Sequence, residues 1–125
     1  MDENGRDQAS DMLGTPTPEM IVHTQVDAYN RHDVDAFLAT YAPDARIYDH
    51  PCTLRMEGLD AMRTAYTAFF DAYPLVTASI TNRIVRGRYV IDHEELSGVP
   101  ERLQGAVVAI YEVSERRIVN VWFLE

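Results

Sequence analysis

The sequence predicts an α+β fold in which three helices precede one curved, mostly antiparallel sheet. In the first half of the chain, apolar residues recur at the spacing of amphipathic helices. In the second half they alternate or run continuously, and short clusters of Gly, Pro and Ser separate the segments. Helices that precede an antiparallel sheet pack on it in layers. A sheet that curves around a helix leaves a concave, mostly apolar interior, where we expect a pocket.

Composition narrows the classes of partner. The chain has 125 residues, enough for one domain, and its 20 acidic and 11 basic residues give a net charge of −9. Such a surface repels phosphate backbones and anionic lipid, so we expect neither nucleic acid nor a membrane as partner. The acidic N-terminus lacks the apolar segment of a secretory signal, which favours a cytoplasmic protein. The single cysteine, Cys52, excludes an internal disulfide and a multi-cysteine zinc site.

The first half of the chain predicts a tail and two helices. Residues 1–17 are acidic and polar with almost nothing to bury, so we expect a flexible tail before a domain of residues 18–125. Thr17 is a suitable N-cap, and Pro18 suits the first position of a helix that ends near residues 30–32. Asp33 caps a second, short helix that residues 42–44 end. We expect Phe37, Leu38 and Tyr41 to share one face of it.

A third helix and the strands follow. Residues 45–50 alternate as a short strand that Pro51 closes, and Gly58 opens a helix that Pro74 stops. The remaining chain predicts four strands, over residues 75–86, 88–97, 103–113 and 117–124. Residues 106–111 are apolar at nearly every position, so we expect both faces of that strand to be covered.

Carboxylates on strands are the candidate chemical groups. Asp49 lies where a strand ends, and residues 92–95 place Asp92, His93, Glu94 and Glu95 inside another. Because side chains on a strand alternate, Asp92 and Glu94 share one face and His93 and Glu95 the other, and one pair must face the concave side. A carboxyl in an apolar pocket has a raised pKa, which suits proton transfer near neutral pH. Two carboxylates held close together divide into an acid and a base.

Structural interpretations of the same residues stay open. Asp92 or Glu94 could instead pair across the hairpin with one of three arginines, Arg83, Arg86 or Arg88. The phenols of Tyr29, Tyr41 and Tyr66 are either core residues or pocket donors. His50 and His93 either carry protons or satisfy a local hydrogen bond. A metal site built from Asp49, His50, Asp92 and Glu94 is a further alternative, although we expect no metal and no cofactor.

Several motifs point to a known family. The chain carries Asn-x-x-Asp at residues 30–33, Tyr-Ala-x-Asp-Ala at 41–45, Asp-x-Pro at 49–51 and a Gly at the start of the third helix. With these motifs, residues 30–66 resemble the first half of ketosteroid isomerases and SnoaL-like proteins, which belong to the nuclear transport factor 2-like superfamily. The closing strands, GAVVAIYEVSERRIVNVWFLE, are similar to the final hairpin of that family. The resemblance covers residues 18–125 and implies a cone-shaped fold with an internal pocket.

The resemblance also implies roles for single residues. Asp49 falls where ketosteroid isomerases keep the general base that moves a proton α to a carbonyl, and Tyr41 and Tyr66 fall on members of their tyrosine network. Gln25 takes the place of the tyrosine that donates to the oxyanion, and Ala109 that of its aspartic acid partner. Since loss of one such donor costs about 10²–10³ in rate, the resemblance does not imply steroid isomerase activity.

The register of the family implies which side chains face inward. It turns Asp92 and Glu94 into the cavity opposite Asp49, and it also turns in Val90, Val107, Ala109, Tyr111, Val119, Val121 and Phe123. Ile118 and Trp122 then lie on the outer sheet face, which this superfamily commonly uses for dimers. The resemblance therefore implies a homodimer.

Together these inferences predict a cofactor-independent enzyme that performs carboxylate acid–base chemistry on a small, largely apolar organic molecule. Asp49 is the expected base, with Asp92 or Glu94 as second acid. The expected substrate-binding residues are Gln25, Tyr29, Tyr41, His50, Tyr66, Ala109, Tyr111 and Phe123. Isomerisation, hydration, hydrolysis and cyclisation stay open. The alternative is a non-catalytic module of the same fold that binds a small molecule or forms a dimeric interaction surface.

Overall fold

The computed structural model describes residues 14–125, in which helices pack on one face of a six-stranded sheet. The strands are β1 (Tyr41–Asp49), β2 (Thr53–Glu57), β3 (Thr77–Arg86), β4 (Tyr89–Ser97), β5 (Gly105–Ser114) and β6 (Arg117–Leu124). Their order is β2-β1-β6-β5-β4-β3, and every neighbouring pair is antiparallel except β1 and β6. The predicted α+β cone is therefore confirmed. Residues 1–13 of the expected tail lie outside the described residues.

The helices begin where the sequence predicts. In α2 (Pro18–Asn30) the Thr17 hydroxyl accepts the Met20 N–H, and in α3 (Val34–Leu38) the Asp33 carboxylate accepts the Ala36 N–H at 3.0 Å. Helix α4 (Leu59–Ala72) starts after Gly58 and stops before Pro74. None of the helices in this part of the chain is long and apolar enough to cross a membrane.

The end of α3 differs from the prediction. Tyr41 does not share the face of this helix, because α3 ends at Leu38 and Tyr41 is the first residue of β1. The carbonyl of Thr40 accepts the N–H of Ile118 at 2.8 Å, so pairing with β6 has already begun there. A long-range partner, invisible in the local pattern, thus converts the expected helix end into a strand.

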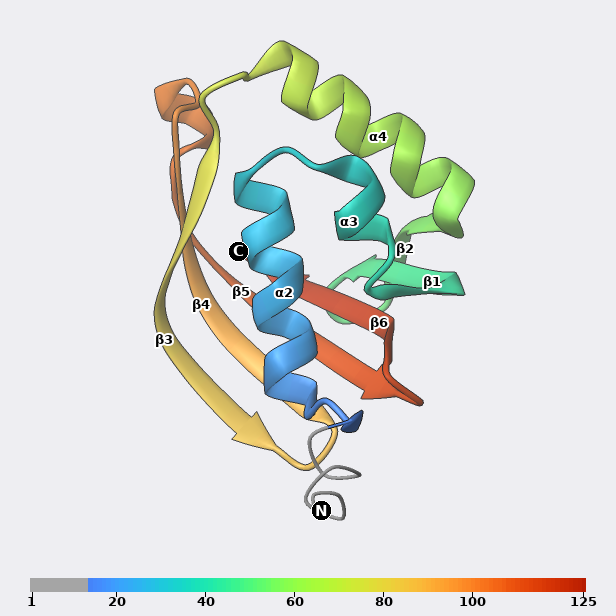
Figure 1. Cartoon of the computed structure of the whole chain (residues 1–125). Helices are drawn as coiled ribbons and strands as arrows, with labels where there is room; N and C mark the ends of the chain where they lie inside the picture. Colours follow the sequence, from blue (N-terminus) through green and yellow to red (C-terminus); the bar gives the residue numbers. More distant parts are fainter. Residues whose placement is uncertain (1–13) are drawn as a thin grey trace.

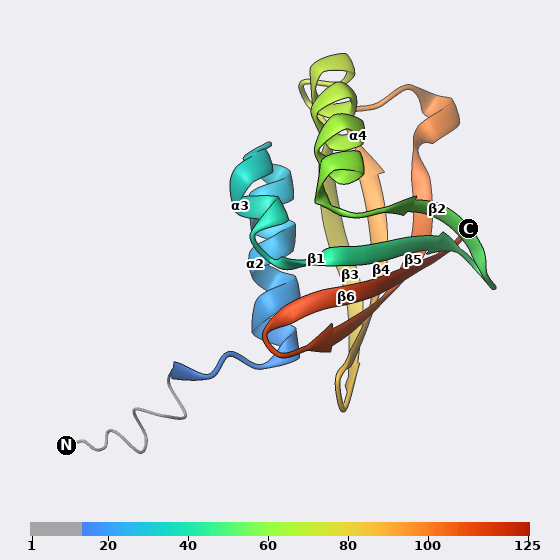
Figure 2. The same ribbon diagram turned by 90° about the vertical axis from the view of Figure 1, so that its right-hand side faces the viewer.

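The sheet bends strongly around α2. In Figure 1, α2 lies across the concave side of the sheet, with α4 near the start of β3, and in Figure 2 the β1–β2–β6 part runs nearly crosswise to the β3–β4 hairpin. The largest cluster of buried residues fills the space between α2, α3 and the inner face. Its members include Val22, Phe37, Ile47, Met62, Val90, Ala109, Tyr111, Ile118 and Val121.

Alternation along β4 follows the predicted register. Val90, Asp92 and Glu94 are buried on the inner face, whereas His93 and Glu95 are exposed. The prediction for β6 fails at Ile118, which is fully buried rather than on the outer face. Ile118 pairs with Val113 while Asn120 pairs with Glu112, so Val119 is an extra residue in a β-bulge. The bulge reverses the alternation, which is why Ile118 points inward.

Strand β2 was not predicted at all. The sequence indicated only one short strand over residues 45–50, but β1 pairs with β2 in a hairpin. Ile47 pairs with Met56 and Tyr48 with Leu54, so Arg55 lies in a bulge without an opposite residue. This hairpin places Arg55 on β2, the strand at one edge of the sheet.

Two side chains at the end of α2 fix the start of β3. The side-chain amide of Asn30 donates to the Ala78 carbonyl at 3.0 Å and its oxygen accepts the Ala78 N–H at 2.8 Å. One ring nitrogen of His32, Nε2, lies 2.7 Å from the Val76 carbonyl, and the ring stacks on Phe70 at 4.4 Å. The end of α2 is thereby held against the connection between α4 and β3.

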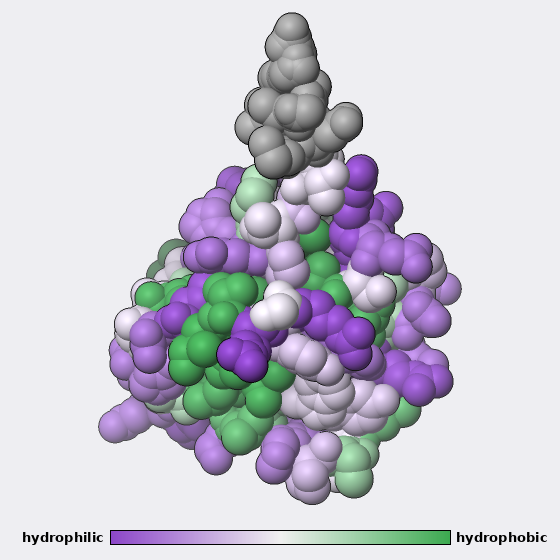
Figure 3. All heavy atoms as spheres, turned by 90° about the horizontal axis from the view of Figure 1, so that it is seen from below, coloured by the Kyte–Doolittle hydropathy of each residue, from purple (hydrophilic) through white to green (hydrophobic). Residues whose placement is uncertain are grey.

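The outer face of the sheet carries an apolar row that crosses all six strands. Register pairs link neighbouring members of the row, and Ile84 at one end is 54% exposed. Figure 3 views the molecule from below and shows hydrophobic side chains gathered in a patch. We call the six residues that these register pairs link the outer row. From β3 to β2 they are Ile84, Ile91, Ile110, Trp122, Tyr48 and Leu54.

Gly98 allows the chain after β4 to turn toward the short 3₁₀ helix η1 (Glu101–Leu103). It has a φ of +74°, and a Cβ at this position would lie 1.9 Å from the Leu75 carbonyl oxygen.

We expect Gly98→Ala to lower the free energy of unfolding by about 3–5 kcal/mol, from strain and a backbone clash together. Gly87→Ala is the matched control, because Gly87 has a φ of +57° but nothing within 4 Å of its Cβ position. It should cost about 1–2 kcal/mol in urea denaturation, and equal losses would contradict the clash.

Candidate functional site

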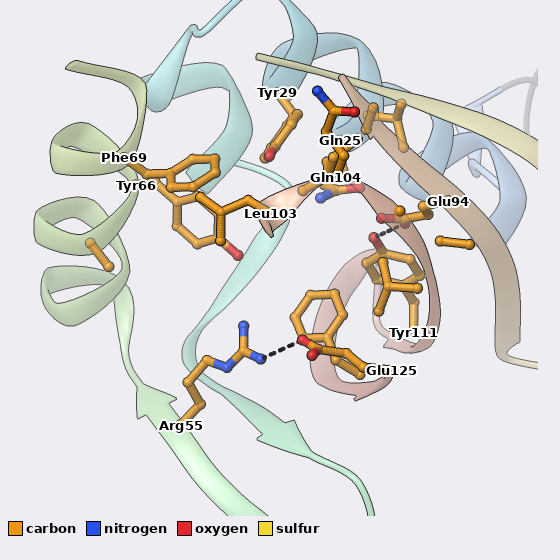
Figure 4. A pocket seen from close by; sticks show the side chains of 18 of the residues that line it. Gln25, Tyr29, Arg55, Tyr66, Phe69, Glu94, Leu103, Gln104, Tyr111 and Glu125 are labelled. Atoms are coloured by element: carbon orange, nitrogen blue, oxygen red, sulfur yellow. Dashed lines mark hydrogen bonds and ion pairs between the residues drawn. The ribbon is translucent and has the colours of Figure 1, made fainter. Parts of the chain in front are cut away.

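A cavity of about 540 Å³ opens between α2, α4, β2 and the inner face of the sheet. Most of its wall is apolar, with Phe69 from α4, Leu103 from η1 and Phe123 from β6. The polar and charged side chains in its wall come from different elements (Figure 4): Gln25, Tyr29, Arg55, Tyr66, Glu94, Arg102, Gln104, Tyr111 and Glu125. A mostly apolar cavity with a few polar groups is the usual form of a small-molecule site.

Glu94 is the acidic group on the inner wall of this cavity. It is 7% exposed, and its Oε2 accepts the hydroxyl of Tyr111 at 2.7 Å. Tyr111 lies on the neighbouring strand β5, four residues beyond Val107, the register partner of Glu94. Its ring reaches Glu94 past Ala109, where the side chain is only a methyl group. Ala109 is fully buried and does not line the cavity, so it contributes by leaving room.

Burial changes the acidity of Glu94. Loss of solvation raises the pKa of its carboxyl to about 7, and the negative charge of Asp92 acts in the same direction. The hydrogen bond from Tyr111 and the charge of Arg83 oppose this shift in pKa. Near neutral pH the carboxyl is therefore divided between its acidic and basic forms, which suits a group that both takes and returns a proton.

Asp92 also faces inward, but its charge is already paired. Both carboxylate oxygens accept hydrogen bonds from Arg83, at 2.6 Å from Nε and 2.8 Å from Nη2. Asp92 is fully buried and does not line the cavity. The structural interpretation of Asp92, a pair across the β3–β4 hairpin, is thus correct. Of the two inward carboxyls, Glu94 is the one that reaches the cavity.

Hydroxyl and amide groups surround the rest of the cavity. Burial raises the pKa of Tyr66 to about 12 and that of Tyr29 further, so both phenols keep their protons and can donate. Gln25 is 5% exposed and its Nε2 donates to the Tyr41 hydroxyl at 3.2 Å. Its Oε1 is the one buried side-chain polar atom of the described residues without a partner. Tyr41 itself lies behind Gln25 and does not line the cavity.

Asp49 and His50 lie apart from Glu94, contrary to the expectation that Asp49 faces the inward carboxyls across the cavity. Both line a separate surface hollow beside Arg55, and the side chain of Asp49 is 48% exposed. The Asp49 carboxylate accepts hydrogen bonds from Nε and Nη2 of Arg55. The backbone N–H of His50 donates to the Phe123 carbonyl at 2.9 Å. Asp49 is therefore an ion-pair partner of Arg55.

Among the cavity-lining residues that sequence reasoning missed are Arg55, Phe69, Leu103 and Gln104. Arg55 depends on β2, which the sequence did not reveal, although the alternation of Leu54 and Met56 after a Pro turn was a usable signal. Leu103 and Gln104 lie at the end of the loop after β4, where no periodicity marks a wall residue. In the described part of the chain, no group of three or more His, Cys, Asp or Glu residues could hold a metal ion. The alternative of a four-residue metal site therefore has no geometric basis.

A protein-family model matches most of the chain. The model of the SnoaL-like domain matches residues 22–121. The chain belongs to the SnoaL-like family. The resemblance to SnoaL-like proteins is thereby confirmed. Among curated protein sequences, none matches the chain significantly.

Solved structures agree on the fold. An uncharacterized cystatin-fold protein from Novosphingobium aromaticivorans is 24% identical, with a TM-score of 0.82 over 89% of this chain and 100% of its own. A candidate polyketide cyclase from Sinorhizobium meliloti is 23% identical, with a TM-score of 0.73 over 89% and 96%. A candidate ketosteroid isomerase from Kribbella flavida is 17% identical, with a TM-score of 0.71 over 86% and 76%. At these identities the likeness establishes the fold of the SnoaL-like chain and leaves its chemistry to the site.

The raised pKa of Glu94 predicts how stability depends on pH. The folded state holds this proton up to a pKa of about 7, whereas the unfolded chain releases it near 4.5. Between these values the folded state binds more protons than the unfolded state, so the free energy of unfolding falls as pH rises and levels off above 7. The loss amounts to about 3 kcal/mol.

Glu94→Gln removes this proton linkage but can still accept the Tyr111 hydroxyl. We expect the variant to gain about 3 kcal/mol relative to the wild type between about pH 4.5 and pH 8, measured by urea denaturation. Glu95→Gln, on the exposed face of the same strand, is the matched control and should follow the wild type. Parallel curves for wild type and Glu94→Gln would show that Glu94 titrates normally.

Proposed function

We propose that this SnoaL-like protein is a cofactor-independent enzyme that moves a proton at a carbon next to a carbonyl group in a small, largely apolar molecule. Glu94 is the general base in this proposal, in place of Asp49. The observation that carries it is a buried carboxyl with a pKa of about 7 in the wall of a mostly apolar cavity. A base whose pKa lies near the working pH is the most effective one for proton transfer.

The surrounding groups fit the charge that such a step develops. The Glu94 carboxylate takes the proton from the α-carbon, the C–H electron pair forms a carbon–carbon double bond, and the carbonyl π electrons move to oxygen. The resulting enolate oxygen accepts a hydrogen bond from the hydroxyl of Tyr29 or Tyr66, both of which stay protonated at neutral pH. In a substrate with a double bond between its β- and γ-carbons, the negative charge extends to the γ-carbon, and Glu94 returns the proton there, which completes an isomerisation. Alternatively, the enolate carbon attacks a second carbonyl of the same molecule. The new carbon–carbon bond closes a ring, and the oxygen of the attacked carbonyl takes the proton from Glu94.

The names of two structural neighbours agree with this class of reaction. One is a candidate polyketide cyclase and the other a candidate ketosteroid isomerase, and polyketides and ketosteroids both contain ketone groups. By the family resemblance, Gln25 stands where ketosteroid isomerases have the tyrosine that donates to the oxyanion. The Oε1 atom of Gln25, which has no partner among the described residues, is an acceptor.

The proposal predicts that Glu94→Gln abolishes proton exchange. With 2-tetralone as a model ketone in D₂O, proton NMR should show the excess exchange due to the enzyme fall by about 10²–10⁴ in this variant. In the wild type, the exchange rate should rise with pH through about 7 and then level, because only the carboxylate form of Glu94 is a base.

Two variants separate Glu94 from the other carboxyls. Glu95→Gln, on the outer face, should exchange protons at the wild-type rate. The exchange rate of Asp49→Asn should fall by less than about tenfold, because this variant keeps Glu94 as the base. If Asp49→Asn loses as much activity as Glu94→Gln, the base lies at Asp49, as the family resemblance implies. If the wild type shows no excess exchange with this or larger cyclic ketones, the chain is the non-catalytic binding module.

We also propose that the outer row mediates a homodimer. Six apolar residues in one line across the sheet form a patch that a monomer would leave in water. A second copy fits this face because a row of mixed charge flanks the outer row, with Arg46 and Arg86 on the same face as Glu57 and Glu112. In a two-fold dimer, such residues can meet their opposites.

The dimer proposal predicts that Trp122→Glu shifts the protein to monomers. Trp122 lies in the middle of the outer row, stacked on Tyr48 at 5.8 Å. A charge there faces the apolar surface of the second copy, which is unfavourable without a partner. Light scattering should give half the mass of the wild type. His93→Glu, an exposed site on the same face, is the control, and a monomeric wild type would contradict the proposal.

A further inference from the structure

We propose that Arg55 is the anchor for a carboxylate of the ligand, so that the substrate is an amphiphilic acid with an apolar body. This inference rests on the proposed function, because it takes the Glu94 cavity as the substrate site. It adds a specificity-determining residue at the opposite end of that cavity. In Figure 4, Arg55 projects from β2 at one end, and Glu94 and Tyr111 lie on the sheet at the other.

A β-bulge places Arg55 and Met56 together in the cavity wall. Because Met56 pairs with Ile47 and Leu54 with Tyr48, Arg55 has no opposite residue on β1. Bulges re-aim a side chain, and they are frequent next to active sites. Regular alternation from Leu54 would place Arg55 on the inner face and Met56 on the outer face with Leu54. The bulge instead keeps both Arg55 and Met56 in the cavity wall.

Three contacts hold the guanidinium group in place. Asp49 accepts from Nε and Nη2, and the plane of the group lies over the Phe123 ring, 4.9 Å from its centroid. The Glu125 carboxylate lies 3.9 Å from Nη2, which is too long for a hydrogen bond. Asp49 is thus a positioning residue for Arg55.

The other side of the guanidinium group is free for a ligand. In the described part of the chain, no group pairs with Nη1, which carries two N–H donors. Figure 4 shows the guanidinium group pointing toward the hydroxyl of Tyr66, inside the cavity. The positive charge of Arg55 lowers the pKa of Tyr66 against the effect of burial, which agrees with this proximity. A carboxylate between the two would accept from Nη1 and from the Tyr66 hydroxyl.

The charge of Arg55 favours an anion at this end of the cavity, and the wall contains a second cation, Arg102. Asp49 neutralises Arg55 from outside the cavity, but a guanidinium group can pair with two carboxylates through its separate edges. Glu125 is 78% exposed and weakly held, so a ligand carboxylate can replace it. At the other end, Glu94 would repel a carboxylate. The ligand is therefore oriented, with its acid at Arg55 and its reactive carbon toward Glu94.

The test compares two probes of the same shape. Binding of 2-naphthoate and of its neutral amide, 2-naphthamide, is measured by calorimetry at about pH 6, where the acid is ionised and Glu94 is mostly protonated. We expect the wild type to bind the carboxylate roughly tenfold or more tightly than the amide. Arg55→Gln should abolish this preference, and Arg55→Lys should keep part of it because the charge remains. Thermal melts confirm that each variant is folded.

Two further variants make the result specific. Arg102→Gln removes another arginine of the cavity wall and should leave the preference intact, whereas Glu125→Gln should strengthen it by removing a competitor. Equal affinity of the wild type for both probes, or a preference that survives Arg55→Gln, would overturn the anchor and leave the role of Glu94 untouched. If neither probe binds at millimolar concentration, the anchor is overturned, and the exchange of 2-tetralone protons decides separately whether Glu94 is a base.

Discussion

The burial of one carboxyl without a countercharge is the constraint on which the site depends. Two carboxyls, Asp92 and Glu94, point inward from the same strand. Arg83 binds both oxygens of Asp92, so the remaining negative charge of the cluster belongs to Glu94. A buried charge is costly in an apolar surrounding, and a single hydrogen bond from Tyr111 offsets only part of that cost. The fold meets this constraint by leaving Glu94 partly protonated near neutral pH.

The sequence predicted the elements whose signals are local. Thr17 with Pro18, Asp33, and Gly58 mark helix starts because capping depends on neighbouring residues alone. The β3–β4 and β5–β6 hairpins follow from alternation and short turns. The failures share one cause, which is pairing with another strand. The β-bulges at Arg55 and Val119 depend on the partner strand of each hairpin, and β1 pairs with the distant strand β6. A single extra residue reverses the inward and outward faces, as it does for Ile118.

For the site, the sequence predicted which face each carboxyl occupies but not which partner it has. Alternation placed Asp92 and Glu94 on one face, and the register of the family turned that face inward. It could not decide which of the two is free, because this depends on the reach of Arg83 across a hairpin. The family resemblance located Asp49 at the end of β1, but β2 brings Arg55 against it and makes it a partner in an ion pair. The role of a carboxylate is thus fixed by its countercharge, which a single strand does not reveal.

The same reasoning explains why the fold alone leaves the activity of this chain open. Several inner-face positions of a bent sheet converge on one cavity, so side chains from different strands can reach the same bound molecule. What selects between them is whether an arginine lies close enough to pair with the carboxyl. In this chain, arginines pair with Asp49 and with Asp92, and none pairs with Glu94 among the described residues. Two of the three carboxyls are thus paired with arginine and one is not. This pairing, more than the course of the backbone, decides which end of the cavity binds charge and which end moves protons.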